Sequence, residues 1–281
     1  PKLRKYAPKC KIILNNAYLH FLRELRAACS SDQNVEDLTK VEETREAELE
    51  MMKLSDCVIS YNDIEHAVIY SHTNGAVQPL KCPWVAPSPQ KQTQFRSTTG
   101  IAFLGSFKHP PNYEGVNWFL TNIFPFLDSS LNIDFNIYGS SMSDSLKEEF
   151  NQSRTYPIGF VENIEDVYLN NRLFIAPLLS GAGIKGKVLS ALAYGIPTIL
   201  TPVAAEGIGL RDETDCLIAD KPEDWIKSIN QLYNNKELWA QLSRNSVEFI
   251  KKNYSFDVGR EQMLKIFEAV DLFKTHSGAI L

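Results

Sequence analysis

The sequence lacks the features on which several common classes of protein depend. Its 281 residues include only five cysteines, which are scattered and form no C-x-x-C pair. This argues against a zinc site and for a reducing compartment, so we expect a cytoplasmic protein. No apolar run reaches the ~18 residues of a membrane-spanning helix, and we see no signal-peptide pattern. With a net charge of −5, the chain has no basic excess that would favour binding to nucleic acid.

What the sequence does contain is a regular alternation of short apolar and amphipathic segments over residues 99–253. The predicted strands are residues 101–104, 133–138, 156–159, 173–177, 197–200 and 216–218. The predicted helices are residues 112–126 (or 117–126), 143–150, 164–169, 184–194, a helix that starts at Pro222, and residues 236–251. Such alternation predicts an α/β fold with a doubly wound parallel sheet, in which ligands bind at the carboxyl ends of the strands.

The first 96 residues predict a smaller α/β unit. Its expected strands are residues 11–14, 57–60 and 77–80, and its expected helices are residues 18–28, 35–54 and one that Asn62 or Asp63 caps and that ends near residue 70. The core-facing side of the second helix is expected to consist of Leu38, Val41, Leu49 and Met52. Three short strands are too few for a complete doubly wound domain, and the chain starts at Pro1 rather than at methionine. We therefore expect the first half of this domain to lie upstream.

The boundaries of the two domains are predicted from composition. Residues 83–98 hold three prolines and many polar residues, which is typical of a linker. We expect an N-terminal domain with linker at residues 1–96, a second domain at 97–256 and a terminal segment at 257–281. Residues 257–274 of that segment predict an amphipathic helix, whose apolar side is expected to consist of Met263, Ile266, Phe267 and Val270.

The segment with the clearest chemistry lies between the strands predicted at 173–177 and 197–200. Gly181, Gly183 and Gly186 crowd the start of a helix, together with Lys185 and Lys187. Backbone N–H groups at a helix N-terminus bind anions, and the two lysines add positive charge. We therefore expect this segment to bind a phosphate or a diphosphate.

Two general motifs fit part of this segment, and neither fits all of it. The three glycines fit the dinucleotide fingerprint G-x-G-x-x-G, but the acid that should follow at the tip of the next strand is Glu206, which lies beyond the strand end. Residues 181–187 nearly fit the phosphate-binding loop G-x-x-x-x-G-K-[ST], but Val188 stands where a hydroxyl must bind magnesium. A glycine-rich turn that only closes an ordinary βαβ unit is a further alternative.

A longer stretch, residues 174–207, resembles the donor-binding loop and helix of family-4-like GT-B glycosyltransferases (glycosyl transferases group 1). In that group, a run such as G-A-G-I-K-G-K-V-L-E-A-x-A-x-G-x-P precedes a strand and T-P-x-x-x-E-G. The run G-S-F-K-H-P-P-N at residues 105–112 resembles the start of the donor domain in the same group. The resemblance spans residues 10–270. It implies a complete C-terminal Rossmann-like domain, part of an N-terminal α/β domain, and a last helix that crosses back toward the N-terminal domain.

The resemblance also implies an activity. A sugar would pass from a nucleotide-diphosphate donor to a sugar, lipid-linked or protein acceptor in glycan or polysaccharide biosynthesis. Transfer would retain the anomeric configuration and need no metal and no other cofactor, and the sequence shows no cluster of acids to hold a metal. A lipid-linked acceptor would bring a peripheral membrane contact.

Carried over residue by residue, the resemblance assigns roles to named side chains. Lys187 would stabilise the diphosphate as it leaves, and His20 would line the catalytic cleft from the acceptor side. The residues expected at the diphosphate are Gly105, Ser106, Gly181, Gly183, Ile184, Lys185 and Gly186. The residues expected at the nucleobase and ribose are Phe160, Val161, Glu162 and Ser190, and Glu206 is expected at the donor sugar.

The chain departs from the family pattern at charged positions. Ala182 and Ser190 stand where the pattern has two glutamates, the second of which binds ribose, and Asn15 and Tyr18 replace two aspartates. A serine cannot make the charge-assisted pair of a carboxylate, a loss on the order of 1.5–3 kcal/mol. These departures support a second hypothesis, a non-catalytic relative that binds nucleotide weakly and serves as a scaffold or partner subunit. A Rossmann dehydrogenase is a third.

Overall fold

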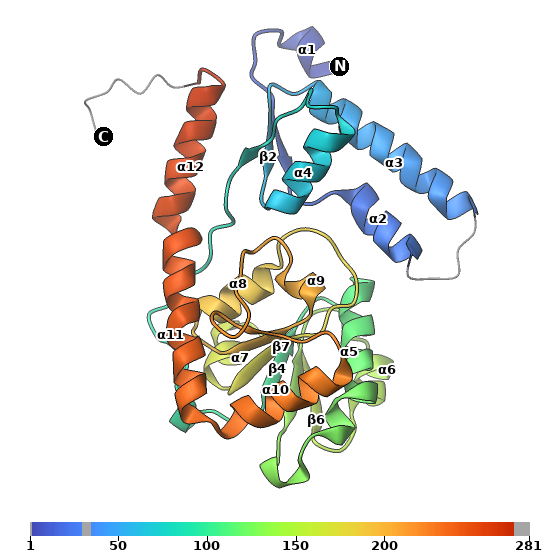
Figure 1. Cartoon of the computed structure of the whole chain (residues 1–281). Helices are drawn as coiled ribbons and strands as arrows, with labels where there is room; N and C mark the ends of the chain where they lie inside the picture. Colours follow the sequence, from blue (N-terminus) through green and yellow to red (C-terminus); the bar gives the residue numbers. More distant parts are fainter. Residues whose placement is uncertain (1, 30–34, 273–281) are drawn as a thin grey trace. The chain divides into compact units, whose positions relative to one another are not determined.

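The computed structural model describes residues 2–29 and 35–272, which form two compact units (Figure 1). Each unit is taken by itself below. The smaller unit is made of the described residues within 1–85, 181–184 and 256–281, and the larger unit of residues 86–180 and 185–255.

The larger unit is built on a six-stranded, entirely parallel sheet with the order β6-β5-β4-β7-β8-β9. Its strands are β4 (Ile101–Leu104), β5 (Phe135–Tyr138), β6 (Thr155–Gly159), β7 (Leu173–Ala176), β8 (Thr198–Leu200) and β9 (Leu217–Ile218). The chain moves outward from β4 in one direction and from β7 in the other. Right-handed crossovers therefore place the helices of the two halves on opposite faces of the sheet. This confirms the predicted doubly wound parallel sheet.

The central strands are apolar along their whole length because helices cover both of their faces. All side chains of β7, and the three from Ile101 to Phe103 in β4, have an exposed fraction of 0%. The edge strand β6 differs, because one of its sides meets solvent. Tyr156 and Ile158 point outward there and are exposed.

The helices of the larger unit begin where their capping residues allow. They are α5 (Pro110–Asn122), α6 (Asp144–Phe150), α7 (Glu165–Leu169), α8 (Gly186–Ala193), α9 (Pro202–Ala205), α10 (Pro222–Asn234) and α11 (Lys236–Asn253). The predicted start of α5 at Asn112 or Asn117 was wrong, because two prolines, which need no N–H partner, form its first positions. Helix α9 was not predicted. Thr201 caps it through a hydrogen bond from the Ala204 N–H, and Pro202 opens it.

The smaller unit contains a three-stranded parallel sheet with the order β1-β2-β3. Its elements are β1 (Ile13–Asn16), β2 (Cys57–Ser60), β3 (Leu80–Lys81), α1 (Lys2–Tyr6), α2 (His20–Cys29), α3 (Val35–Lys53), α4 (Asp63–His72) and α12 (Phe256–Ala269). Asn62 caps α4 as predicted, because its side-chain oxygen accepts the Glu65 N–H at 2.8 Å. The strands predicted at residues 11–14 and 77–80 lie two or three residues further along the chain.

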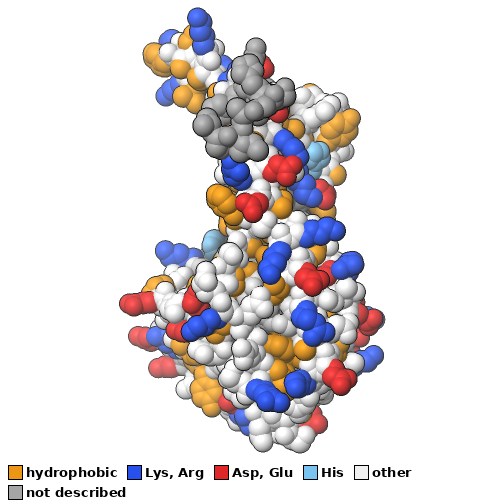
Figure 2. All heavy atoms as spheres, turned by 90° about the vertical axis from the view of Figure 1, so that its left-hand side faces the viewer, with side chains coloured by type: hydrophobic (Ala, Val, Ile, Leu, Met, Phe, Trp, Pro, Cys, Tyr) orange, Lys and Arg blue, Asp and Glu red, His pale blue; other side chains and the backbone are white. Residues whose placement is uncertain are grey.

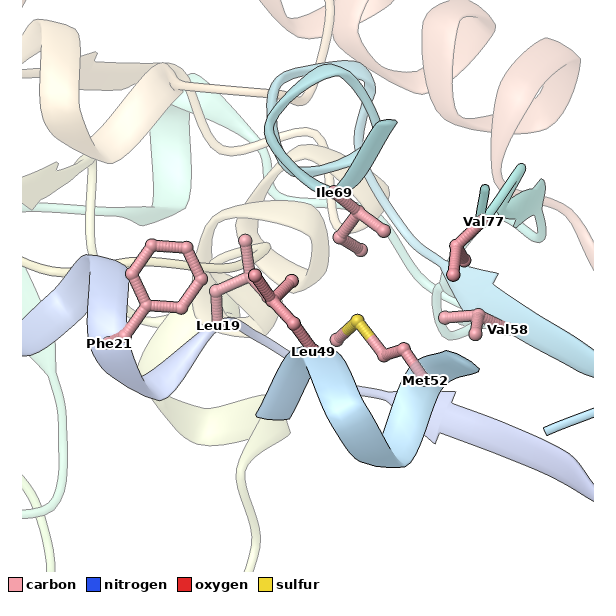
Figure 3. Packing of buried hydrophobic residues seen from close by; sticks show 7 residues of the cluster. All are labelled: Leu19, Phe21, Leu49, Met52, Val58, Ile69 and Val77. Atoms are coloured by element: carbon pink, nitrogen blue, oxygen red, sulfur yellow. The ribbon is translucent and has the colours of Figure 1, made fainter. Parts of the chain in front are cut away.

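Alternate side chains of β2 enter two separate cores of this unit. Val58 packs into a cluster with side chains of α2, α3 and α4, shown in Figure 3. Cys57 and Ile59 point to the other face, where Ile266 and Val270 of the terminal segment cover them. This alternation is the ordinary geometry of a strand that is buried on both faces.

One core prediction in this unit was wrong. Leu38 is 49% exposed, although Val41, Leu49 and Met52 of the same helix are buried. Leu38 lies in the first turns of α3, roughly 16 Å along the helix axis from Leu49. The cluster of Figure 3 includes Leu49 and Met52 near the other end of the helix and does not extend to Leu38.

Two surface properties bear on partners. No helix within residues 2–29 and 35–272 is both long and apolar enough to cross a membrane. On the face drawn in Figure 2, Lys and Arg side chains alternate with Asp and Glu side chains, and no broad area of one sign is visible there.

Candidate active site

The sheet order of the larger unit itself marks a place for a ligand. Between the neighbouring strands β4 and β7 the direction of the connections reverses. Open parallel sheets bind ligands outside the carboxyl ends of their strands at such a switch point. Gly105 and Ser106 directly follow β4, and Lys185 and Lys187 lie at the start of α8, which follows β7. The structure thus brings two of the predicted groups of site residues to one edge of the sheet.

The same order argues against the dinucleotide fingerprint. In dinucleotide-binding domains the glycine-rich turn follows the first strand of the sheet. Here the three glycines follow β7, the fourth strand of the unit, and the first strand β4 is followed by Gly105 and Ser106. The position of the glycines therefore does not support a Rossmann dehydrogenase.

Asn112 joins Lys187 to the loop after β4. Its side chain is 7% exposed in the first turn of α5. The Lys187 ammonium donates a hydrogen bond to Asn112 Oδ1, and Asn112 Nδ2 donates to the Ser106 carbonyl at 2.7 Å. Lys187 Nζ also lies 4.5 Å from the centre of the Phe103 ring, a favourable cation–π distance. The lysine head group is therefore fixed from two sides.

Lys187 gains and loses its proton near neutral pH. Burial lowers the pKa of Lys187 to about 7, and the positive charge of Lys185 lowers it further. A lysine whose charged form is disfavoured in this way gains from an anion placed beside it. Binding of an anion would in turn raise the pKa of Lys187 and restore its charge.

Two glycines in this region are required by packing. A Cβ atom on Gly105 would lie 2.7 Å from the Asn112 side chain, and one on Gly139 would lie 1.8 Å from the Gly105 carbonyl oxygen. The absence of side chains lets the ends of β4 and β5 approach each other and leaves space for Asn112. Packing thus explains the glycine at position 105 without a ligand.

The residues predicted for the nucleobase lie after the edge strand. Phe160 is 72% exposed in the loop between β6 and α7, and Glu162 is also exposed. Gly159 begins this turn with φ of +82°, a conformation that favours glycine. An exposed aromatic ring after a strand end can stack on a base, and this role stays a prediction.

Ser190, predicted at the ribose, is engaged inside the protein. Its hydroxyl hydrogen-bonds the Tyr168 hydroxyl, and burial of that phenol raises the pKa of Tyr168. Tyr168 stacks on Tyr194, with ring centres 5.0 Å apart, and Tyr194 donates to Glu165 Oε1 at 3.0 Å. Burial and this carboxylate raise the pKa of Tyr194 to about 12. Sequence reasoning missed the tyrosine pair, because both residues look like ordinary core positions.

In the smaller unit, a carboxylate holds His20 in place. Glu48 Oε1 lies 2.7 Å from His20 Nδ1, and the two Glu48 oxygens accept the N–H groups of His20 and Phe21 at 3.0 Å each. Glu48 therefore caps α2 and orients the ring, which also packs on Tyr18. A ring that donates from Nδ1 to a carboxylate presents Nε2 as an acceptor.

The Gly183 amide is also engaged. Its N–H donates to Glu65 Oε1 at 2.8 Å, and the Glu65 side chain is 2% exposed. A Cβ on Gly183 would lie 2.8 Å from Tyr18 Cβ, and Arg26 donates to the Gly181 carbonyl at 2.8 Å. A diphosphate would have to replace Glu65 to use this amide. No sequence pattern pointed to Glu65, which lies 118 residues away along the chain.

The remaining predicted residues lie at the ends of helices. Ile184 precedes α8, Gly186 is its first residue, and Glu206 follows α9; all three are half-buried. Their contacts with diphosphate or sugar stay predictions. Among the residues that the structure describes, no three His, Cys, Asp or Glu side chains lie close enough together to hold a metal ion.

Comparison with known proteins shows what the part of the chain that contains this site resembles. Residues 98–235 match the model of the family described as glycosyl transferases group 1. This part of the chain is similar to that family, and the match covers slightly less than half of the 281 residues. It includes β4 to β9, the switch point and both lysines of the site.

Individual proteins are also similar to this chain. An uncharacterized 44.6 kDa protein in the cps region of Klebsiella pneumoniae is 26% identical over 163 residues, which cover 55% of this chain and 42% of that protein. Sucrose-phosphate synthase from Thermosynechococcus elongatus has a TM-score of 0.71 at 15% identity, over 92% of this chain and 68% of that one. The pneumococcal O-GlcNAc transferase GtfA has a TM-score of 0.68 at 14% identity, over 96% of this chain and 54% of that one.

These comparisons establish the fold and show how much of each relative the chain spans. The two parallel sheets with their helices match GT-B glycosyltransferases, as predicted. The chain spans less than half of the Klebsiella protein and about half of GtfA.

The contact of Glu48 with α2 leads to a stability prediction. We expect Glu48→Ala to lower the free energy of unfolding by about 1–2 kcal/mol, because it removes the acceptor of two N–H groups at the start of α2. Urea unfolding monitored by circular dichroism measures this. Glu50→Ala on the same helix is the control, since Glu50 is exposed. Equal stability of the two variants would contradict the capping role.

Proposed function

We propose that the protein is a GT-B glycosyltransferase that moves a sugar from a nucleotide-diphosphate donor to an acceptor. The observation that carries the proposal is the position of Lys185 and Lys187, two mutually repelling cations at the switch point of a group 1 domain. A diphosphate is the anion that suits them. We further propose that transfer retains the anomeric configuration and proceeds without a bound metal.

In this mechanism, the protein acts on departure of the leaving group. As the anomeric bond breaks, negative charge grows on the diphosphate, and only interactions that strengthen with that charge accelerate the reaction. The Lys187 ammonium supplies such an interaction in a half-buried position, where electrostatic effects exceed those in water. Gly105, Ser106 and Lys185 would hold the diphosphate from the same edge. His20, held by Glu48, would approach the acceptor hydroxyl.

The comparisons support the substrate class. The structure of GtfA was solved with UDP and GlcNAc, and that of HepE from Anabaena with UDP-glucose. The Klebsiella relative is named for the cps region, which agrees with a role in glycan biosynthesis. A uridine nucleotide sugar is therefore the first donor to test, and a sugar or lipid-linked acceptor is part of the proposal.

A second candidate is a non-catalytic relative that binds nucleotide. Two observations favour it: the Ser190 hydroxyl is hydrogen-bonded to Tyr168, and the Gly183 N–H is hydrogen-bonded to Glu65. Both groups were expected to contact the donor.

Calorimetry with UDP and GDP, followed by a donor hydrolysis assay, separates the candidates. We expect a dissociation constant for UDP between about 1 µM and 1 mM, the usual range for enzyme substrates, together with slow hydrolysis of the matching donor. Binding without turnover of any donor would favour the non-catalytic relative. Absence of binding to both nucleotides would overturn the proposal, and a fluorescence titration with NADH then tests the dehydrogenase.

A further inference from the structure

Lys187 Nζ donates a hydrogen bond to the side chain of Asn112. Within the described residues, no other side chain of the larger unit is assigned a hydrogen bond from this ammonium. Asn112 comes from α5, on the opposite side of the switch point from α8. A lysine side chain has four rotatable bonds, so an unrestrained ammonium would sample many positions. The contact with Asn112 selects one of them.

The amide of Asn112 is itself fixed. Its Nδ2 donates to the Ser106 carbonyl at 2.7 Å, so the amide cannot flip without losing both hydrogen bonds. The missing Cβ of Gly105 provides the space for this amide, because a Cβ there would lie 2.7 Å from it. Asn112 is also 7% exposed, so water cannot readily replace it. The space left by Gly105, the Ser106 carbonyl and the buried Asn112 amide therefore hold the ammonium group of the lysine in one position.

Resting on the glycosyl transfer proposed above, we infer that Asn112 is a positioning residue that sets the Lys187 ammonium toward the diphosphate and links it to the loop of Gly105 and Ser106. The ligand class is the diphosphate of a nucleotide sugar. The Ser106 carbonyl, the Asn112 amide and the Lys187 ammonium form one hydrogen-bonded series from the loop after β4 to α8.

Lysine NMR tests this arrangement without a substrate. Protein labelled with carbon-13 at the lysine ε position is titrated with pH, and the Lys187 resonance is assigned by its loss in Lys187→Met. We expect Asn112→Ala to lower the pKa of Lys187, since the charged form loses its acceptor, and Asn112→Asp to raise it, since a carboxylate favours the ammonium. Asn117→Ala is the control on the same helix, because Asn117 is exposed.

Kinetics provide a second measurement. We expect Asn112→Ala to reduce kcat on the order of 10²-fold, the effect of misplacing a catalytic group by about 1 Å, while UDP affinity changes far less. A merely structural asparagine would lower stability in both variants without moving the pKa of Lys187 in opposite directions. An unchanged pKa in Asn112→Ala and Asn112→Asp, both folded, would overturn the inference. Absence of UDP binding with the pKa shifts intact would refute the proposed function alone.

Discussion

Replacement of Lys187 by alanine should abolish sugar transfer and leave the protein folded. Loss of one preorganised group that stabilises developing charge costs on the order of 10²–10³ in kcat, and loss of a full charge costs more. The fold should survive, because burial already disfavours the charged form of Lys187 and its removal relieves that cost. The measurement is donor turnover at saturating acceptor, with thermal unfolding of the same preparation.

A matched variant separates the charge from the side-chain volume. Lys187→Met keeps the aliphatic stem that packs beside Phe103 but carries no ammonium, so it should be as inactive as the alanine variant. Full activity of either variant would refute the assignment of Lys187. A loss of activity together with a collapse of the unfolding transition would leave the lysine as a structural residue.

The same lysine predicts a pH dependence. In the free protein its pKa is about 7, so its charge is lost as the pH rises through neutrality. A diphosphate restores that charge, which moves the pKa upward in the complex. We therefore expect kcat/KM, which reports the free enzyme, to fall above about pH 7, and kcat to fall only at higher pH. Coincident profiles for the two parameters would contradict this.

Replacement of Gly139 by alanine should have the largest effect on stability. The added Cβ would lie 1.8 Å from the Gly105 carbonyl oxygen, and both atoms belong to backbone that parallel strands hold in place. Overpacking of this kind costs about 3 kcal/mol, which lowers Tm by roughly 10 °C in a domain of this size. UDP affinity should fall as well, because the displaced carbonyl moves the loop that anchors Asn112. Differential scanning calorimetry and nucleotide titration measure both effects.

Gly209→Ala is the appropriate control for this clash. Gly209 has φ of +87°, but no atom lies within 4 Å of the position that its Cβ would take. Alanine there therefore meets only the cost of its backbone conformation, about 1 kcal/mol. A Gly139→Ala protein as stable as Gly209→Ala would show that the strand ends can separate freely. The close packing described at the end of β4 and β5 would then be wrong.

The strands of the larger unit were predictable because parallel strands buried on both faces leave continuous apolar runs. Helix starts were less predictable, since Pro110 and Pro111 opened α5 before the expected asparagine cap. In the smaller unit, β1 includes Asn15 and Asn16, which no apolar pattern marks as strand. Asn16 is buried there with Glu65 as its partner, a contact that only the tertiary fold creates.

In the candidate site, too, some features are visible in the sequence and others arise only from the tertiary fold. The spacing of the glycines and lysines, which are neighbours in sequence, predicts an anion site, and that role stays a prediction. Asn112 lies 75 residues from Lys187, so its role depends on how α5 packs beside α8. In the sequence, the two tyrosines near Ser190 stand at positions that look like ordinary core. Only the hydrogen bonds of Tyr168 and Tyr194 distinguish them from core residues.

The contact between Glu65 and Gly183 changes what binding of a nucleotide can gain. Before any ligand arrives, this amide is already satisfied by a Glu65 carboxyl oxygen rather than by water. An incoming phosphate oxygen would exchange one oxygen–amide hydrogen bond for another, so the net gain at that point is small. Selectivity for a doubly charged ligand must then come from the lysines, and because both are at least half-buried, added salt should screen them less than it screens surface charges.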